Sequence, residues 1–76
     1  MQRLADLLTP LELERARLVA EGFSNRVIAA RTGVTEISVR QALYSIYEKL
    51  GFDRDSTESL YLPRILLAQR YDREYR

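Results

Sequence analysis

Several polar side chains with hydrogen-bonding potential share one face in the stretch GVTEISVRQALYSIYEKLGF, residues 33–52. Residues three or four apart lie next to each other on a helix surface, so a helical stretch has distinct faces. The outward face carries Arg40, Gln41, Tyr44 and Ser45. An arginine can donate two hydrogen bonds to guanine, a glutamine can pair with adenine, and a tyrosine can reach a phosphate or a thymine methyl group. These side chains are typical of a surface that reads the edges of DNA bases.

The same spacing also fits a solvated helix face with no binding role. The opposite face would carry the apolar residues Val39, Ala42, Ile46, Tyr47 and Leu50. Such an amphipathic helix is common in small helical proteins, where one stripe covers the core and the other faces water. The spacing alone therefore leaves both interpretations open.

Length and composition limit the class of protein. The chain has 76 residues, 46% of them hydrophobic and 30% charged, which is typical of one globular domain covering residues 1–76. It has no cysteine and no histidine, so we expect no disulfide, no metal site and no cofactor. No apolar run approaches the length of a membrane span or a secretory signal. We expect a cytoplasmic protein without a membrane partner.

Positive charge gathers in the middle of the chain. The net charge is only +1, but residues 23–52 hold four basic residues against two acidic ones. A local positive excess favours a negatively charged partner for this segment.

The chain shows helical periodicity throughout and no persistent strand pattern, which predicts an all-α fold. The clearest helix start is at Thr9, where the hydroxyl can cap the helix and Glu12 can reach back to the Thr9 amide. Pro10 then falls at the first helical position, where a missing N–H costs nothing. This helix is predicted to continue to Gly22, which can take the left-handed conformation that ends a helix.

Two further helices are predicted in the middle of the chain. Ser24 can cap a short helix over residues 25–32 that ends at Gly33, with Ile28 and Ala29 facing inward. Thr35 can cap a longer helix over residues 36–50 that ends at Gly51. A short helix, a turn with glycine and a longer amphipathic helix form a helix-turn-helix, whose second helix can lie in the major groove of DNA.

The segment after Phe52 is predicted to form a fourth helix that starts at Ser56 or Thr57. Pro63 should kink this helix or split it into two short helices, because a helix interior does not tolerate proline. We expect its core face to carry Leu60, Leu62, Ile65, Leu66 and Ala68, with a fraying end from Tyr71. The apolar residues of this segment predict packing on the same domain or, as the alternative, a homodimer through residues 56–70.

Residues 8–52 resemble the LuxR-type (GerE-like) DNA-binding domain. The shared features, in order, are Leu-Thr-Pro-x-Glu, Glu-Gly-x-Ser-Asn, Ile-Ala, a glycine turn with a Thr cap, Val-Arg and Lys-Leu-Gly. The resemblance implies a LuxR-like core over residues 8–52, a variant helical segment over 56–76, and a sequence-specific transcription regulator that binds double-stranded DNA. It also implies that the helix over residues 36–50 reads the major groove.

The resemblance suggests roles for individual residues. Arg40 matches the basic residue after the family's valine, which touches bases or phosphates, and Gln41 and Tyr44 fall on other positions that face the groove. Arg26 matches the basic residue after Ser-Asn, where the family commonly contacts a phosphate. Ser38 and Ser45 would add hydroxyl contacts to phosphates, although a role as helix caps or as plain surface residues fits them as well.

The chain departs from the family pattern at several positions. Ala42 and Tyr44 stand where histidine and a basic residue are common, which lowers the charge available for phosphates. Leu43 places an apolar side chain where a polar one is usual. Arg15 and Ala16 replace large aliphatic residues of the first helix and predict an altered core.

Two other classes of function are alternatives to a DNA-binding regulator. Leu43, Tyr44 and Tyr47, if exposed, would suit a module that binds RNA polymerase, a sigma factor or a response regulator. Sigma factor region four shares the helix-turn-helix, but the Leu-Thr-Pro start and the Lys-Leu-Gly end favour the LuxR type. The chain lacks the usual residues of nucleophilic and metal catalysis, so an enzyme is not expected.

Overall fold

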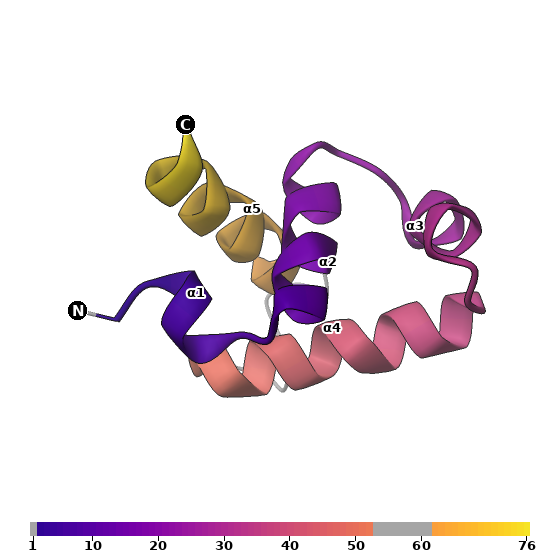
Figure 1. The fold of residues 1–76 in the computed structure, drawn as a ribbon, viewed down its shortest axis with the longest axis horizontal. Coiled ribbons are helices and arrows are strands. Elements are labelled where there is room, and N and C mark those ends of the chain that lie inside the picture. The colour runs from indigo at the N-terminus through magenta and orange to yellow at the C-terminus, as the bar shows by residue number, and fades with distance from the viewer. Residues whose placement is uncertain (1, 53–61) are drawn as a thin grey trace.

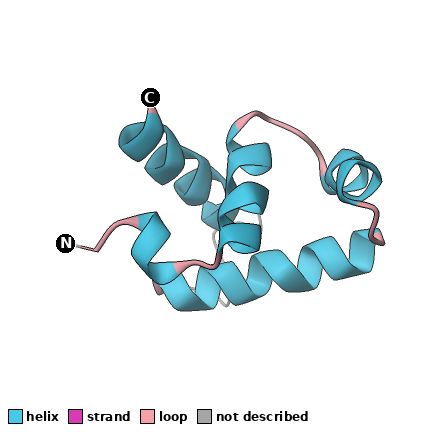
Figure 2. Ribbon diagram, viewed as in Figure 1, coloured by secondary structure: helices cyan, strands magenta, loops and turns pink. Residues whose placement is uncertain are grey.

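The computed structural model describes residues 2–52 and 62–76, and every regular element within them is a helix (Figures 1 and 2). The helices are α1 (Leu4–Leu7), α2 (Pro10–Ala20), α3 (Asn25–Thr32), α4 (Glu36–Leu50) and α5 (Leu62–Tyr75). Figure 1 shows α4 along one edge of the molecule, with the other helices on one side of it. The predicted all-α fold with a helix-turn-helix is confirmed.

The start of α2 follows the predicted capping pattern. The Thr9 hydroxyl accepts a hydrogen bond from the Glu12 amide at 3.1 Å, and the Glu12 carboxylate accepts one from the Thr9 amide at 2.9 Å. Pro10 occupies the first position of the helix. The helix ends at Ala20, and Gly22 follows with a φ of 90°. The predicted capping box is confirmed.

The hydrophobic core lies where α2 packs against both α4 and α5, and α3 packs against α4. Its largest fully buried side chains are Leu4, Ile28, Val39, Ile46 and Leu67. Ile28 and Ala29 of α3 are both buried, as predicted. The core therefore holds α3 and α4 in place as a unit.

The buried face of α4 differs from the predicted one. Leu43 is only 2% exposed and lies in the core, so the prediction of an outward Leu43 is wrong. Val39, Leu43 and Ile46 follow the i, i+4, i+7 pattern of a buried stripe, whereas Ala42 is half-buried. Tyr47 is also buried, and this burial raises the pKa of its hydroxyl. The apolar stripe of α4 is thus centred on Leu43.

The helix α1 is absent from the sequence prediction. It is one turn long, and the Arg3 amide donates a hydrogen bond to the Asp6 carboxylate at 3.2 Å. Leu4 is fully buried, and its amide donates to the Glu74 carboxylate of α5 at 2.9 Å. A single turn leaves no periodic pattern to find, and its stability depends on contacts with a distant helix.

Pro63 is the second residue of α5, whose described part begins at Leu62. A proline in the first turn breaks no helical hydrogen bond, because the first N–H groups of a helix have no partner within it. From Leu62 the helix runs through to Tyr75. The kink or split predicted at Pro63 concerns the join to the residues before Leu62, which lie outside the described residues, so it stays a prediction. The predicted starts at Ser56 and Thr57 lie outside the described residues.

The core face of α5 also differs from the prediction. Leu67 is fully buried, while Ile65, which was expected to cover the core, is 49% exposed. Leu66 and Ala68 are half-buried, and Leu60 lies outside the described residues together with the side chain of Leu62. In this part of α5, Leu67 is therefore the residue that faces the core.

The C-terminal turns of α5 are part of the packed domain. Tyr71 packs against the core, and its ring stacks on Tyr75 with 4.6 Å between the ring centroids. Burial raises the pKa of the Tyr71 hydroxyl. The predicted fraying from Tyr71 is wrong, since the helix continues to Tyr75.

Two unusual residues of α2 do lie in the interior. Ala16 is fully buried, and Arg15 is 8% exposed. The Arg15 guanidinium donates to the Leu11 carbonyl at 3.4 Å, while its buried Nε has no partner in the described part of the chain. Both of these residues of α2 therefore lie in the core.

An ion pair connects the start of α2 to the end of α4. The Lys49 ammonium lies 2.7 Å from the Glu12 carboxylate. Partial burial raises the pKa of Glu12, but the hydrogen bonds from Lys49 and Thr9 outweigh it, so the pKa lies below its ordinary value of 4.5. A carboxyl group with a lowered pKa stabilises the fold above its ordinary pKa, and the contribution is lost as the pH falls through the lower value.

We therefore expect the substitution Glu12→Gln to reduce the free energy of unfolding by about 1 kcal/mol at pH 7. Glutamine keeps an oxygen for the Thr9 amide and removes only the charge. Urea unfolding of both proteins at pH 7 and pH 3 checks this, and the difference should shrink at pH 3. Lys49→Gln is the matched control, because it should cost nothing further in the Glu12→Gln background. A difference that is equal at the two pH values would contradict the role of this ion pair.

Candidate nucleic-acid interface

The turn between α3 and α4 is built by local hydrogen bonds. The Ser24 hydroxyl caps α3 by accepting the Val27 amide at 3.3 Å. Gly33 ends α3 with a φ of 72°, and a Cβ there would meet no atom within 4 Å. Glycine is favoured at this position by the left-handed backbone and not by close packing. The turn thus sets the angle at which α4 leaves α3.

The first turn of α4 is held by a second cap. The Thr35 hydroxyl accepts the Ser38 amide at 3.1 Å and donates to the Ser38 hydroxyl at 3.0 Å. Ser38 stays exposed, but its hydroxyl already has one partner within the protein. The capping roles predicted for Ser24 and Thr35 are confirmed.

The outward face of α4 is exposed over most of its length. Its predicted DNA-binding residues Ser38, Arg40, Gln41, Tyr44 and Ser45 are all exposed. The C-terminal helix α5 packs mainly against α2, and of its described residues Arg64 alone lines a depression beside this face. No described helix lies on the other side of α4 in Figure 1. No described helix therefore prevents a partner from reaching this face.

A depression of about 450 Å³ beside α4 brings several of these residues together. Arg26 of α3, and Arg40 and Tyr44 of α4, line it along with Arg64 of α5. The rings of Tyr44 and the buried Tyr47 lie 6.4 Å apart between centroids. Ser38, Gln41 and Ser45 do not line the depression and lie elsewhere on the surface of α4.

Arg64 lines this depression although no sequence pattern predicts it there. Its guanidinium donates to the Asn25 side-chain oxygen at 2.7 Å and also to the Phe23 carbonyl. It thereby links the start of α5 to the start of α3. A basic residue after Pro63 is the only local signal, and it does not reveal a partner 39 positions away.

The basic residues of the helix-turn-helix differ in the contacts that they make. Lys49 is paired with Glu12, and the Arg31 guanidinium lies over the Phe23 ring, 4.1 Å from its centroid. Within residues 2–52 and 62–76, the structure shows no ion pair for Arg26 or Arg40. Arg26 and Arg40 are therefore the two basic residues of the helix-turn-helix for which the described residues show neither an ion pair nor a ring contact.

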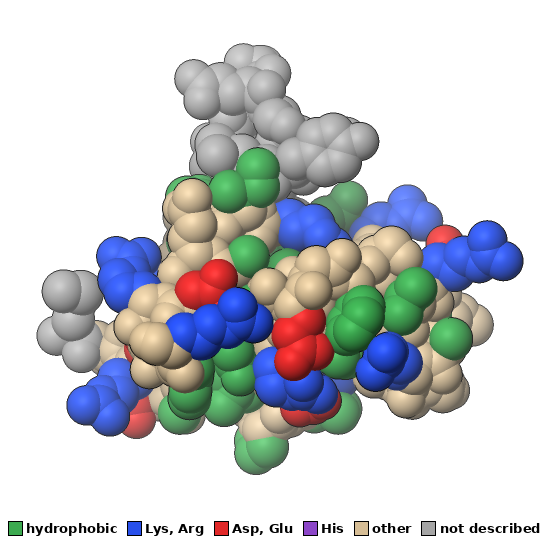
Figure 3. Space-filling view, turned by 90° about the horizontal axis from the view of Figure 1, so that it is seen from above, with side chains coloured by type: hydrophobic (Ala, Val, Ile, Leu, Met, Phe, Trp, Pro, Cys, Tyr) green, Lys and Arg blue, Asp and Glu red, His purple; other side chains and the backbone are tan. Residues whose placement is uncertain are grey.

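The opposite side of the molecule has a different electrostatic character. Figure 3 views the side away from α4 and shows acidic and basic side chains next to one another. On α2, for example, Arg17 forms ion pairs with Glu14 and with Glu21, the latter at 2.8 Å. Paired charges of this kind leave little net attraction for a polyanion, so the face of α4 is the better candidate.

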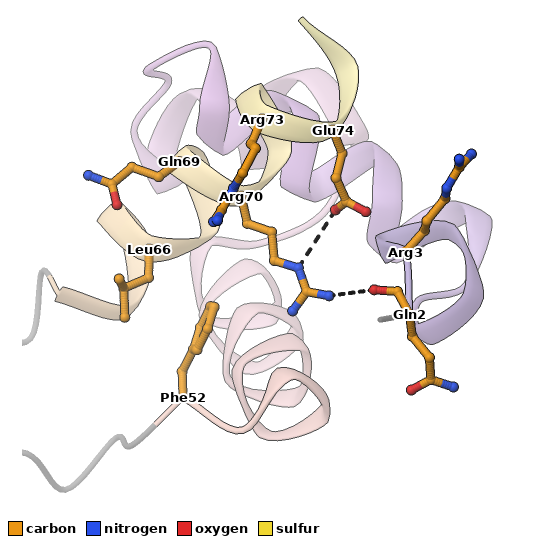
Figure 4. A pocket seen from close by; sticks show the side chains of 8 residues that line it. All are labelled: Gln2, Arg3, Phe52, Leu66, Gln69, Arg70, Arg73 and Glu74. Carbon is orange, nitrogen blue, oxygen red and sulfur yellow. Dashed lines mark hydrogen bonds and ion pairs between the residues drawn. The ribbon is translucent and has the colours of Figure 1, made fainter.

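A second depression of about 570 Å³ lies between the N-terminal segment, Phe52 and α5 (Figure 4). Arg70 spans it, donating to the Gln2 carbonyl at 2.8 Å and pairing with Glu74 at 3.6 Å. None of the predicted DNA-binding residues lines it. These contacts fasten the N-terminal segment to α5 and give the depression a structural role.

No group of three or more acidic, histidine or cysteine side chains within the described residues could hold a metal ion. None of the described helices is long and apolar enough to cross a membrane.

Comparison with known proteins identifies a family. A model of the bacterial regulatory proteins of the luxR family (GerE) matches residues 6–58. One protein of Mycobacterium bovis and two of Mycobacterium tuberculosis, all named as HTH-type transcriptional regulators, are each 48% identical over 44 residues. The match covers 58% of this chain but only 5% of the length of each relative. No solved structure matches the chain significantly.

Proposed function

The chain belongs to the luxR family of bacterial regulatory proteins, and from this premise we propose that it reads the major groove of double-stranded DNA with α4. The family is one of transcription regulators and not of enzymes. The observation that carries the proposal is the exposed polar face of α4. A cytoplasmic regulator with a single DNA-binding domain over residues 1–76 is part of the same proposal.

The chemistry of each side chain suggests its role. Arg40 would donate two hydrogen bonds to guanine, and Gln41 would pair with adenine. Tyr44 would bind a phosphate or a thymine methyl group, and Ser38 and Ser45 would add hydroxyl contacts to phosphates. Arg26 projects from α3 into the same depression as Arg40, which supports a phosphate contact beside the groove.

The role of Arg26 can be tested by the salt dependence of binding. Each phosphate contact releases condensed counterions, so losing one contact makes the slope of log affinity against log salt less negative by about one. We expect Arg26→Gln to show this change and to weaken binding equally on all sequences. Fluorescence anisotropy with a labelled duplex at several salt concentrations measures it.

Arg73→Gln is the matched control for Arg26→Gln, because Arg73 is exposed but lines the second depression. This variant should keep the slope of the unsubstituted protein. An equal change of slope in the two variants would show that Arg26 has no particular place at the interface. Absence of duplex binding by the unsubstituted protein at low salt would contradict the proposed function itself.

The alternative function, a module that binds RNA polymerase, a sigma factor or a response regulator, has lost much of its support. Of the three side chains that suggested it, Leu43 and Tyr47 are buried and only Tyr44 is exposed, at 39%. The same salt titration separates the two functions, since a protein partner would not require binding to DNA. The homodimer through residues 56–70 stays a prediction, because residues 56–61 lie outside the described residues. Leu67 is buried in the core of its own chain.

A further inference from the structure

An isoleucine on α4 is exposed without an evident structural reason. Ile37 and Leu11, each 60% exposed, are the most exposed large hydrophobic side chains in the described part of the chain. Single exposed hydrophobic residues are common and need no explanation by themselves. Ile37 differs because it is the second residue of α4, at the N-terminal end of the helix proposed to enter DNA.

Helical geometry places Ile37 on the outward face and not at its margin. Successive residues of an α-helix turn by about 100°, so residues four apart are only about 40° from each other around the axis. Ile37 therefore lies beside Gln41, on the side of the helix opposite Val39 and Ile46, which are fully buried. An apolar side chain thus sits within an otherwise polar recognition face.

The major groove offers one apolar group to such a side chain. Among the base edges exposed there, only thymine carries a methyl group, and apolar side chains read it by direct contact. Residues near the N-terminus of a recognition helix are the ones that reach the base edges. An exposed β-branched side chain at this position gains free energy when it buries a methyl group.

We propose that Ile37 is a specificity-determining residue that contacts the C5-methyl group of a thymine. The inference rests on the proposed function, since it needs α4 to lie in the major groove. Four residues of helix rise about 6 Å, which corresponds to about two base-pair steps. The thymine should therefore lie within about two base pairs of the base that Gln41 reads.

The test uses duplexes that carry the preferred site obtained by selection from randomised DNA. Each thymine is replaced in turn by deoxyuridine, which keeps the hydrogen-bonding groups and removes only the methyl group. The unsubstituted protein should lose about fourfold in affinity at one position, the loss expected for one buried methyl group. Ile37→Ala should bind the thymine duplex several-fold more weakly and show no further loss with deoxyuridine at that position.

Two matched variants complete the design. Leu11→Ala removes the equally exposed side chain of α2 and should keep the full sensitivity to deoxyuridine. Ile37→Val keeps both γ-carbons and removes only the δ-methyl group, so it should keep most of that sensitivity. Urea unfolding of the variants checks that folding is unchanged, as expected for an exposed position.

The outcomes distinguish this inference from the proposed function. Three results would overturn the role of Ile37 and still agree with DNA binding by α4. The unsubstituted protein could bind duplexes without sensitivity to deoxyuridine, Ile37→Ala could be equally sensitive, or the preferred site could lack thymine. If the unsubstituted protein binds no duplex, both proposals fail. If Ile37→Ala instead loses binding to a protein partner and keeps its DNA binding, the side chain belongs to a protein interface.

Discussion

Replacing Leu67 with alanine should lower the free energy of unfolding by about 2–5 kcal/mol. Leu67 is fully buried in the core, where α5 packs against α2. Truncation removes apolar contacts and leaves a cavity that the surrounding helices fill only in part. A domain of 76 residues has a small core and a stability near the lower end of the usual range. The variant should therefore be largely unfolded or close to it at 37 °C.

Ile65→Ala provides the matched control for Leu67→Ala. Ile65 lies on the same helix two residues earlier, but it is 49% exposed. Its truncation should change the free energy of unfolding by about 0.5 kcal/mol or less. Urea unfolding followed by circular dichroism measures both variants. If Ile65→Ala were the more damaging substitution, the orientation of α5 on α2 would be wrong.

Replacing Arg40 with alanine should weaken binding to the preferred DNA site by about 5–150-fold, or about 1–3 kcal/mol. Arg40 is exposed on α4 and, in the described part of the chain, forms no ion pair that would hold it away from a ligand. A guanidinium that donates two hydrogen bonds to one guanine discriminates against other bases. The variant should therefore also lose its preference at one base pair of the site.

Arg40→Lys separates the charge of Arg40 from its hydrogen-bonding geometry. Lysine keeps the positive charge but cannot reproduce the planar pair of donors. The Arg40→Lys variant should therefore keep the salt dependence of DNA binding more fully than the preference at that base pair. Binding is measured by anisotropy on the preferred site and on its single-base variants. Equal affinity of Arg40→Ala and the unsubstituted protein across that set would remove Arg40 from base recognition.

The sequence predicted those parts of the fold that depend on local signals. Thr9, Ser24 and Thr35 all cap helices in the structure, and Gly33 and Gly51 end helices in the left-handed conformation. A cap needs only residues within one turn, so its pattern is complete in a short stretch of sequence. The helix-turn-helix was predictable for this reason.

The errors concern which side of a helix faces the core. Leu43 and Leu67 are buried although the prediction placed their neighbours Ala42, Leu66 and Ala68 inward. Several apolar residues in succession fit more than one helical stripe, and the choice between stripes is made by the packing partner. The packing partners are α3 and α2 for α4, and α2 for α5. Tertiary packing and not local pattern therefore decided these positions.

Contacts between distant residues could not be predicted from one sequence. Arg64 bonds to Asn25, and Lys49 pairs with Glu12, across 39 and 37 positions of the chain. Neither pair has a local pattern, and each depends on the final arrangement of the helices. The sequence alone suggested Arg26, Arg40 and the other residues proposed to touch DNA, while Arg64 and Ile37 drew attention only through the depression and the exposed surface of the structure.

Selection of binding sites from randomised duplex DNA is the most direct test that the exposed face of α4 reads a DNA sequence. The unsubstituted protein should enrich a short motif, and Arg40→Ala should enrich a motif degenerate at one guanine–cytosine pair. Recovery of random sequence by the folded, unsubstituted protein at low salt would contradict the claim. So would an identical motif from a folded variant in which Arg40 and Gln41 are both alanine.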